Sequence, residues 1–228
     1  MMIEVLDNAD LVAIKAASII AEEARKAVTL RGCFIFAVSG GKTPWKMLRA
    51  LTDEDVPWER MHIVQVDERL APEGHPDRNM THLRESLIGH APILPERIHA
   101  MQMEEKDPEA AAASYSRTIR EIAGSSGIID LIHLGLGPDG HTASLIPGDP
   151  VLDITDQDVA LTVIYHGRQR LTLTYPIINR ARKILWLITG SEKNEMFQRL
   201  IDSDLSIPAG RISQEHAMVL ADKDAANQ

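Results

Sequence analysis

The sequence contains one cysteine, Cys33, so an internal disulfide bond is impossible. This residue begins the apolar run CFIFAV, which predicts a buried, unreactive thiol and argues against redox chemistry. Aromatic residues are also scarce, at 4% of the chain, but the hydrophobic content of 44% is enough for a full core. No linker or internal repeat interrupts the chain, and we expect residues 1–228 to form a single α/β domain.

Long apolar runs and an excess of basic residues are missing as well. No run reaches the roughly 20 apolar residues of a membrane-spanning helix, and the N-terminal MMIEVLDNAD carries acidic residues where a signal peptide carries basic ones. We therefore expect a cytoplasmic protein without membrane contact. The formal charge of -9 argues against nucleic acid as a partner. A small anion stays compatible with this charge, because a few well-placed cations can hold a phosphate locally.

Helical and strand patterns alternate along the chain. Helices are predicted over residues 10–30, 44–51, 79–88, 108–123 and 191–201, and strands over residues 33–39, 61–66, 129–135, 184–189 and 216–220. Residues 159–165 and 170–175 are predicted to form two further strands, for which an antiparallel arrangement is open. The alternation predicts a layered α/β fold with a doubly wound, mostly parallel sheet flanked by helices.

Ionisable residues follow four of the predicted strands, in the loops SGGKTP, DERLAP, PDGHTASL and TGSEKN. The loops at the carboxyl ends of parallel strands line the ligand crevice of an open sheet. The sequence thus predicts that Lys42, Arg69, His141 and Lys193 gather at one edge of the sheet. The alternative is that these charges simply face solvent, as polar loop residues commonly do.

The loop SGGKTP resembles a nucleotide-binding loop only superficially, since Phe36 stands where such a loop needs a glycine. The pair Gly40 and Gly41 gives a permissive backbone, with Thr43 expected as the helix N-cap and Pro44 at the first helical position. This combination predicts a nest for one phosphate group. A tight turn without a ligand is the alternative.

The segment GLGPDGH places Asp139 two residues before His141. We expect a helix to begin at His141, where its positive end would favour an uncharged ring that can accept a proton, and we expect Asp139 to orient this ring. The other histidines lack the spacing of a metal site, so we predict no metal. Ser39 and Ser144 lie outside a Gly-x-Ser-x-Gly motif, which argues against a covalent serine intermediate.

Five segments, SGGKTP, VDERLAP, DLIHLGLGPDGHTASLIPG, RLTLTYP and IPAGRI, resemble in this order the 6-phosphogluconolactonases, which share a wider family with the glucosamine-6-phosphate isomerases. The resemblance implies a modified Rossmann-like fold and hydrolysis of 6-phosphogluconolactone, a sugar phosphate lactone of the pentose phosphate pathway, without a cofactor. It implies catalytic roles for His141, Asp139 and Arg69. The implied phosphate site comprises Ser39, Gly40, Gly41, Lys42, Thr43, Arg170 and Lys193.

The sequence departs from the family pattern at three places. Lys42 replaces a small residue, Ile146 replaces a phenylalanine, and the prolines usual before Arg170 are missing. Two alternatives stay open. The first is a glucosamine-6-phosphate deaminase and isomerase, which usually has a glutamate after Asp-Gly-His; the segment TASLIPG has no acid, which favours the lactonase. The second is a sugar-phosphate-binding module without activity; there is no room for the helix-turn-helix segment that such a module usually carries. We expect a monomer or a small homo-oligomer.

Overall fold

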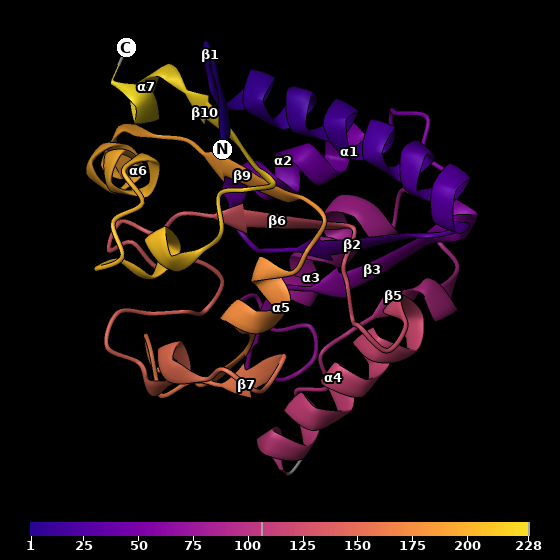
Figure 1. Cartoon of the computed structure of the whole chain (residues 1–228). Helices are drawn as coiled ribbons and strands as arrows, with labels where there is room; N and C mark the ends of the chain where they lie inside the picture. Colours follow the sequence, from indigo (N-terminus) through magenta and orange to yellow (C-terminus); the bar gives the residue numbers. More distant parts are fainter. Residues whose placement is uncertain (106, 228) are drawn as a thin grey trace.

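The computed structural model describes residues 1–105 and 107–227. Its centre is a seven-stranded sheet in which every paired strand is parallel to its neighbour, in the order β1-β10-β9-β6-β2-β3-β5 (Figure 1). The strands are β1 (Met2–Leu6), β2 (Phe34–Val38), β3 (Met61–Gln65), β5 (Ile98–His99), β6 (Leu131–Gly135), β9 (Ile184–Ile188) and β10 (Ala217–Asp222). From β2 the chain builds outward through β3 and β5, and it then returns to build the other side from β6. The point of reversal therefore lies between β2 and β6.

Helices cover both faces of this sheet, as predicted (Figure 1). One face carries α1 (Ala9–Arg31), α2 (Lys42–Leu51) and α3 (Asn79–Leu83), and the other carries α4 (Pro108–Ala123), α5 (Tyr175–Asn179), α6 (Asn194–Ile201) and α7 (Lys223–Ala226). Strand β2 contributes to both cores, since Phe34 and Phe36 pack on the α1 side while Ile35 and Ala37 pack on the opposite side. This two-sided burial explains why β2 is a continuous apolar run.

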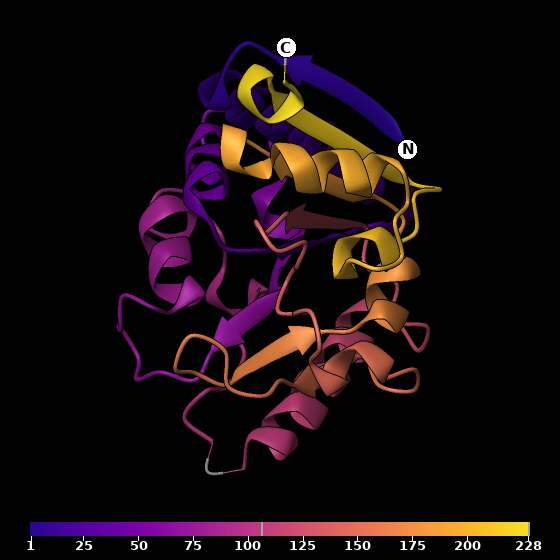
Figure 2. The ribbon, with the colours of Figure 1, turned by 90° about the vertical axis from the view of Figure 1, so that its left-hand side faces the viewer.

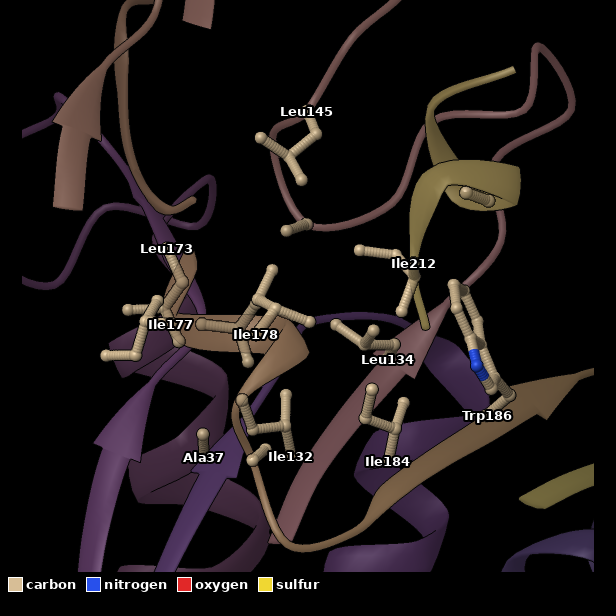
Figure 3. Close-up of a cluster of buried hydrophobic side chains, with 14 of the residues drawn as sticks. Ala37, Ile132, Leu134, Leu145, Leu173, Ile177, Ile178, Ile184, Trp186 and Ile212 are labelled. Carbon is tan, nitrogen blue, oxygen red and sulfur yellow. The ribbon is translucent and has the colours of Figure 1, made fainter. Parts of the chain in front are cut away.

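The core on the α5 side also anchors the turn that follows β6. Figure 3 shows Leu134 of β6 and Ile184 of β9 facing Ile178 of α5, with Trp186 of β9 beside Ile212 and Leu145 above them. Leu145 is fully buried in this cluster. The segment after β6 is therefore held against the sheet by apolar packing and does not extend freely into solvent.

A second, three-stranded antiparallel sheet lies beyond the carboxyl end of β3, in the order β4-β8-β7 (Figure 2). It consists of β4 (Asp67–Arg69), β8 (Arg170–Leu173) and β7 (Val159–Leu161). The backbone amide of Leu173 donates to the carbonyl of Val66, 2.8 Å away, which joins this sheet to the end of β3. The two strands predicted over residues 159–165 and 170–175 are confirmed with shorter bounds, and their open arrangement is antiparallel, whereas β4 was not expected.

Local signals explain how the chain enters β2. The Asn8 side chain caps α1 by accepting from the amides of Asp10 and Leu11, and α1 ends at Gly32, whose φ of 80° is a left-handed conformation suited to glycine. The next residue, Cys33, is half-buried, and burial raises the pKa of its thiol.

Most predicted elements are confirmed, with shifted boundaries. The predicted helix over residues 79–88 continues beyond α3 as a π-helical turn, Arg84–Ile88, and the one over residues 191–201 begins with a 3-10 turn, Ser191–Lys193. Sequence analysis did not predict β1, which precedes α1 and pairs with β10. Among the described residues, no helix combines the length and apolar composition needed to cross a bilayer.

Candidate active site

A cavity of about 610 Å³ opens at the carboxyl ends of the parallel strands, beside the point of reversal between β2 and β6. Loops at such a point diverge to opposite faces of the sheet and leave a crevice between them. Predicted site residues from all four loops and from β8 line it: Ser39, Gly40, Gly41, Lys42, Thr43, Arg69, His141, Arg170 and Lys193. Asp139 lies beside His141 and contacts it. The structure thus brings the predicted residues together, while their roles stay predictions.

The glycine loop opens helix α2 earlier than expected. Gly41, with a φ of 137°, is the N-cap residue and the helix begins at Lys42, so the prediction of Thr43 as N-cap was wrong. The Thr43 hydroxyl instead lies 2.7 Å from the hydroxyl of Thr189, after β9. Because no side chain in the described chain caps α2, its first amide groups are available to an anion in the cavity.

Gly40 allows the loop after β2 to approach helix α3 closely. A Cβ atom at Gly40 would lie 2.2 Å from Oδ1 of Asn79. Asn79 is itself buried and fixed, since its Nδ2 donates to the backbone carbonyl of Asp67 at 3.0 Å. A side chain at position 40 would consequently displace either the glycine loop or the start of α3. Sequence reasoning missed Asn79, because nothing in its local sequence marks this contact.

A buried histidine supports the same loop from within the sheet. The amide of Ser39 donates to Nδ1 of His133, on β6, at 3.3 Å. Burial lowers the pKa of His133 to about 3, so the ring is uncharged and its Nδ1 can accept. Sequence analysis grouped His133 with the histidines that form no metal site and gave it no role.

The predicted helix starting at His141 is absent. Residues 142 to 145 form a tight turn with a bridge between Thr142 and Leu145, and Ala143 has a φ of 53°. The backbone amide and side chain of Ser144 are engaged elsewhere, by Thr172 and Asp67, and these contacts replace helical hydrogen bonds. A helix dipole therefore does not act on His141, and the expected reason for an uncharged ring was wrong.

The Asp139 carboxylate orients the His141 ring. Its Oδ1 lies 2.5 Å from Nδ1 of His141 and also accepts the His141 backbone amide at 3.1 Å. Burial alone would raise the pKa of Asp139, but the charge and hydrogen bonds of His141 outweigh it and lower this pKa. An ionised carboxylate only accepts hydrogen bonds, so Nδ1 of His141 carries the proton of this contact, and in the uncharged ring the lone pair lies on Nε2.

Tyr165 contacts the Asp139–His141 pair on one side and Arg170 on the other. Its hydroxyl donates to Oδ2 of Asp139 at 3.2 Å, and its ring meets the His141 ring edge-on with centroids 5.9 Å apart. The guanidinium carbon of Arg170 lies 5.0 Å from the centre of the same ring. Sequence analysis did not single out Tyr165, and no sequence motif marks it.

Two arginines stand side by side at the wall formed by the small sheet. Arg69 on β4 and Arg170 on β8 are directly opposed in the antiparallel register. The Nε atoms of both are buried and have no hydrogen-bond partner within the part of the chain that the structure describes. Burial, followed by the Arg69 charge, lowers the pKa of Arg170 against the opposing effect of Asp67. Neighbouring cations with unused donors favour an anionic ligand.

The hairpin before Arg170 contains no proline. Tyr165 and Arg168 exchange backbone hydrogen bonds around His166 and Gly167, whose φ values of 50° and 77° are those of a primed hairpin turn. The Arg168 side chain donates from Nε to Asp77 at 2.7 Å. The hairpin is thus held to the segment after β4 by an ion pair and not by the stiffness of proline.

Lys193 completes the cavity wall from the loop after β9. It lies in the 3-10 turn before α6 and lines the cavity. The preceding loop is fixed because the amide of Gly190 donates to the Asp222 carboxylate at 3.0 Å. Within the described ranges, no group of three or more histidine, cysteine, aspartate or glutamate side chains is arranged to hold a metal ion.

Comparison with known proteins agrees with this geometry. The family model described as glucosamine-6-phosphate isomerases/6-phosphogluconolactonase matches residues 7–221. The chain belongs to this family. Members with solved structures show the same fold, so the predicted modified Rossmann-like sheet of this family is confirmed.

Individual relatives are named for both activities of the family. A 6-phosphogluconolactonase from Synechocystis sp. is 36% identical over 195 residues, which cover 84% of this chain and 81% of the relative. The structure of a 6-phosphogluconolactonase from Thermotoga maritima has a TM-score of 0.85 at 28% identity and covers 97% of this chain and 98% of its own. A monomeric glucosamine-6-phosphate deaminase has a TM-score of 0.86 at 19% identity, covering 100% and 99%, and shows the shared fold alone.

Proposed function

We propose that this protein hydrolyses 6-phospho-D-glucono-1,5-lactone to 6-phospho-D-gluconate in the oxidative pentose phosphate pathway. One observation carries the proposal: Asp139 holds Nδ1 of His141, no described residue bonds to Nε2, and the other walls of the cavity carry cations. The printed names of the Synechocystis and Thermotoga relatives support the same substrate.

In the proposed mechanism, Nε2 of His141 takes a proton from a water molecule as the water oxygen attacks the lactone carbonyl carbon. A tetrahedral intermediate forms, and the bond between this carbon and the ring oxygen then breaks as His141 returns the proton to that oxygen. Asp139 keeps the imidazole oriented and stabilises its transient positive charge. No step in this mechanism needs a metal ion or a cofactor.

The cations are assigned to the substrate phosphate and to the oxyanion that forms at its carbonyl. Arg69 stabilises the negative charge that develops on the carbonyl oxygen. The phosphate is bound by Ser39, Gly40, Gly41, Lys42, Thr43, Arg170 and Lys193. Binding a distant phosphate fixes the sugar, and this binding energy lowers the barrier at the carbonyl carbon.

The decisive experiment follows the loss of freshly generated 6-phosphogluconolactone above its spontaneous hydrolysis. We expect His141→Ala to lower turnover by ~10²–10⁴-fold, the usual effect of removing a general base. His90→Ala is the matched control, because His90 is exposed and does not line the cavity. Equal rates for His141→Ala and the parent would show that the assigned base is wrong.

The alternative activity in the family is deamination of glucosamine 6-phosphate. The segment between Thr142 and Pro147 supplies no carboxylate next to His141, which favours the lactonase. Ammonia release from glucosamine 6-phosphate by the purified protein, without lactone hydrolysis, would reverse the assignment.

The proposal also includes the domain organisation, location, oligomeric state and partners of the protein. We propose that residues 1–228 act as one domain, because both apolar cores pack on the same central sheet. A cytoplasmic location fits a chain whose single cysteine cannot form an internal disulfide bond. We keep a monomer or small homo-oligomer as part of this proposal, with neither nucleic acid nor membrane as a partner.

A further inference from the structure

We propose that Tyr165 is a positioning residue that couples the Asp139–His141 pair to Arg170 and thereby sets both turnover and substrate binding. This inference rests on the proposed lactonase function, which it extends by a residue outside the predicted site. Tyr165 stands on the hairpin that precedes β8.

The hydroxyl of Tyr165 completes the hydrogen bonding of the Asp139 carboxylate. Oδ1 of Asp139 accepts from Nδ1 and from the backbone amide of His141, and Oδ2 accepts from the Tyr165 hydroxyl at 3.2 Å. With both oxygens engaged, the carboxylate cannot rotate about its bond without losing a hydrogen bond. The His141 ring is therefore held in one orientation and one tautomer.

The ring of Tyr165 acts on the opposite wall. Arg170 places its guanidinium carbon 5.0 Å from the ring centre, at a distance where a cation is attracted to an aromatic face. The hydrogen bond of this guanidinium to Ser144 is long, since Nη1 lies 3.4 Å from the Ser144 hydroxyl. The Asp67 charge offsets the repulsion of Arg69, and the tyrosine ring adds to this attraction and keeps the guanidinium of Arg170 directed along the cavity wall.

The hairpin itself is suited to hold Tyr165 in place. The turn at His166 and Gly167 orients the tyrosine, the His166 ring packs against it with centroids 4.1 Å apart, and Arg168 ties the hairpin to Asp77. The preceding Val163 and Ile164 are 52% and 69% exposed. Because the hairpin lies at the surface, a change at Tyr165 should affect the site far more than the core.

Two substitutions separate the hydroxyl from the ring. Tyr165→Phe removes the hydrogen bond to Asp139 and keeps the ring, so we expect kcat for 6-phosphogluconolactone to fall by about 3- to 10-fold with KM within about twofold of the parent. Tyr165→Leu removes the ring as well, so we expect the same fall in kcat and a KM raised by about 2- to 5-fold. A purely structural role would not divide kcat and KM in this way.

Tyr175→Phe is the matched control, because the Tyr175 hydroxyl donates to the carbonyl of Pro208 at 3.0 Å and the residue does not line the cavity. We expect parental kcat and KM for this variant. Equal kinetics for Tyr165→Phe and Tyr175→Phe, or an unchanged KM in Tyr165→Leu, would overturn the inference.

A measurement without substrate keeps the inference separate from the function. In nitrogen-15 NMR spectra of the intact protein, we expect His141 to show the tautomer protonated at Nδ1, and Tyr165→Phe to show a mixture of tautomers. The His141 signals are identified by their loss in His141→Ala. An unchanged tautomer in Tyr165→Phe would overturn the role of Tyr165, whereas a parent that fails to hydrolyse the lactone would overturn only the proposed function.

Discussion

At the scale of single residues, Gly137 shows how little free space surrounds the proposed base. A Cβ atom built on Gly137 would lie 2.1 Å from Nδ1 of His141 and 2.7 Å from Oδ1 of Asp139. Its backbone amide also donates to the His141 carbonyl at 2.8 Å. The absence of a side chain at this position lets the chain fold back so that these two groups meet.

We predict that Gly137→Ala lowers kcat by about 10²-fold, because a misplacement of roughly 1 Å in a reacting group can cost that much. Steady-state kinetics on the lactone, together with the melting temperature, would measure the effect. Gly135→Ala provides the comparison, since its Cβ would meet nothing within 4 Å, and we expect a much smaller loss. Similar losses in both variants would contradict the steric argument.

At the scale of elements, the pairing of β4 with β8 places two arginines in direct opposition. We predict that inorganic phosphate stabilises the protein and that Arg170→Met weakens this effect, because an anion relieves the repulsion between Arg69 and Arg170. A ligand at ten times its Kd raises the free energy of unfolding by ~1.4 kcal/mol. Thermal unfolding with increasing phosphate tests this. Arg49→Met, at an exposed position outside the cavity, should keep the full stabilisation.

The sequence predicted those elements whose signals are local. Helix α1 has a side-chain cap at Asn8 and a glycine stop at Gly32, and β2 is an apolar run, so short-range physics determines both. Strand β4 escaped prediction because its charged residues, Asp67–Arg69, form a strand only through pairing with β8, far along the chain. The turn after His141 and the contacts of Tyr165 depend on the same long-range packing, so the sequence could predict which loops meet but not how their side chains are oriented.

At the scale of the whole molecule, one buried and two half-buried histidines link stability to pH. Burial, followed by the Arg97 charge, lowers the pKa of His62 from 6.5 to about 4, and burial with Arg97 also lowers the pKa of His99. Burial lowers the pKa of His133 to about 3. In the unfolded chain these histidines therefore bind protons near pH 6.5. In the folded chain His62 binds its proton only when the pH is well below 5.

We predict that the contribution of these histidines to the free energy of unfolding is complete above pH 6.5. This contribution falls as the pH is lowered from 6.5 to about 4. Each histidine contributes at most ~1.4 kcal/mol per pH unit, and the half-exposed His62 and His99 contribute less. Urea unfolding at pH 7 and pH 5 measures the difference. We expect His62→Gln to show a smaller drop than the parent and the exposed His90→Gln to show the same drop. A parent whose stability does not change over this range would refute the linkage.

Cys33 lies just before β2 and offers a single attachment point for a spectroscopic label. A strand rises about 3.3 Å per residue, so the backbone of Cys33 lies roughly 20 Å from that of Ser39, just after β2. A fluorophore or spin label on this cysteine would report distances to a tagged ligand without removal of any other thiol. Because burial raises the pKa of Cys33, the labelling reaction should run best in alkaline buffer.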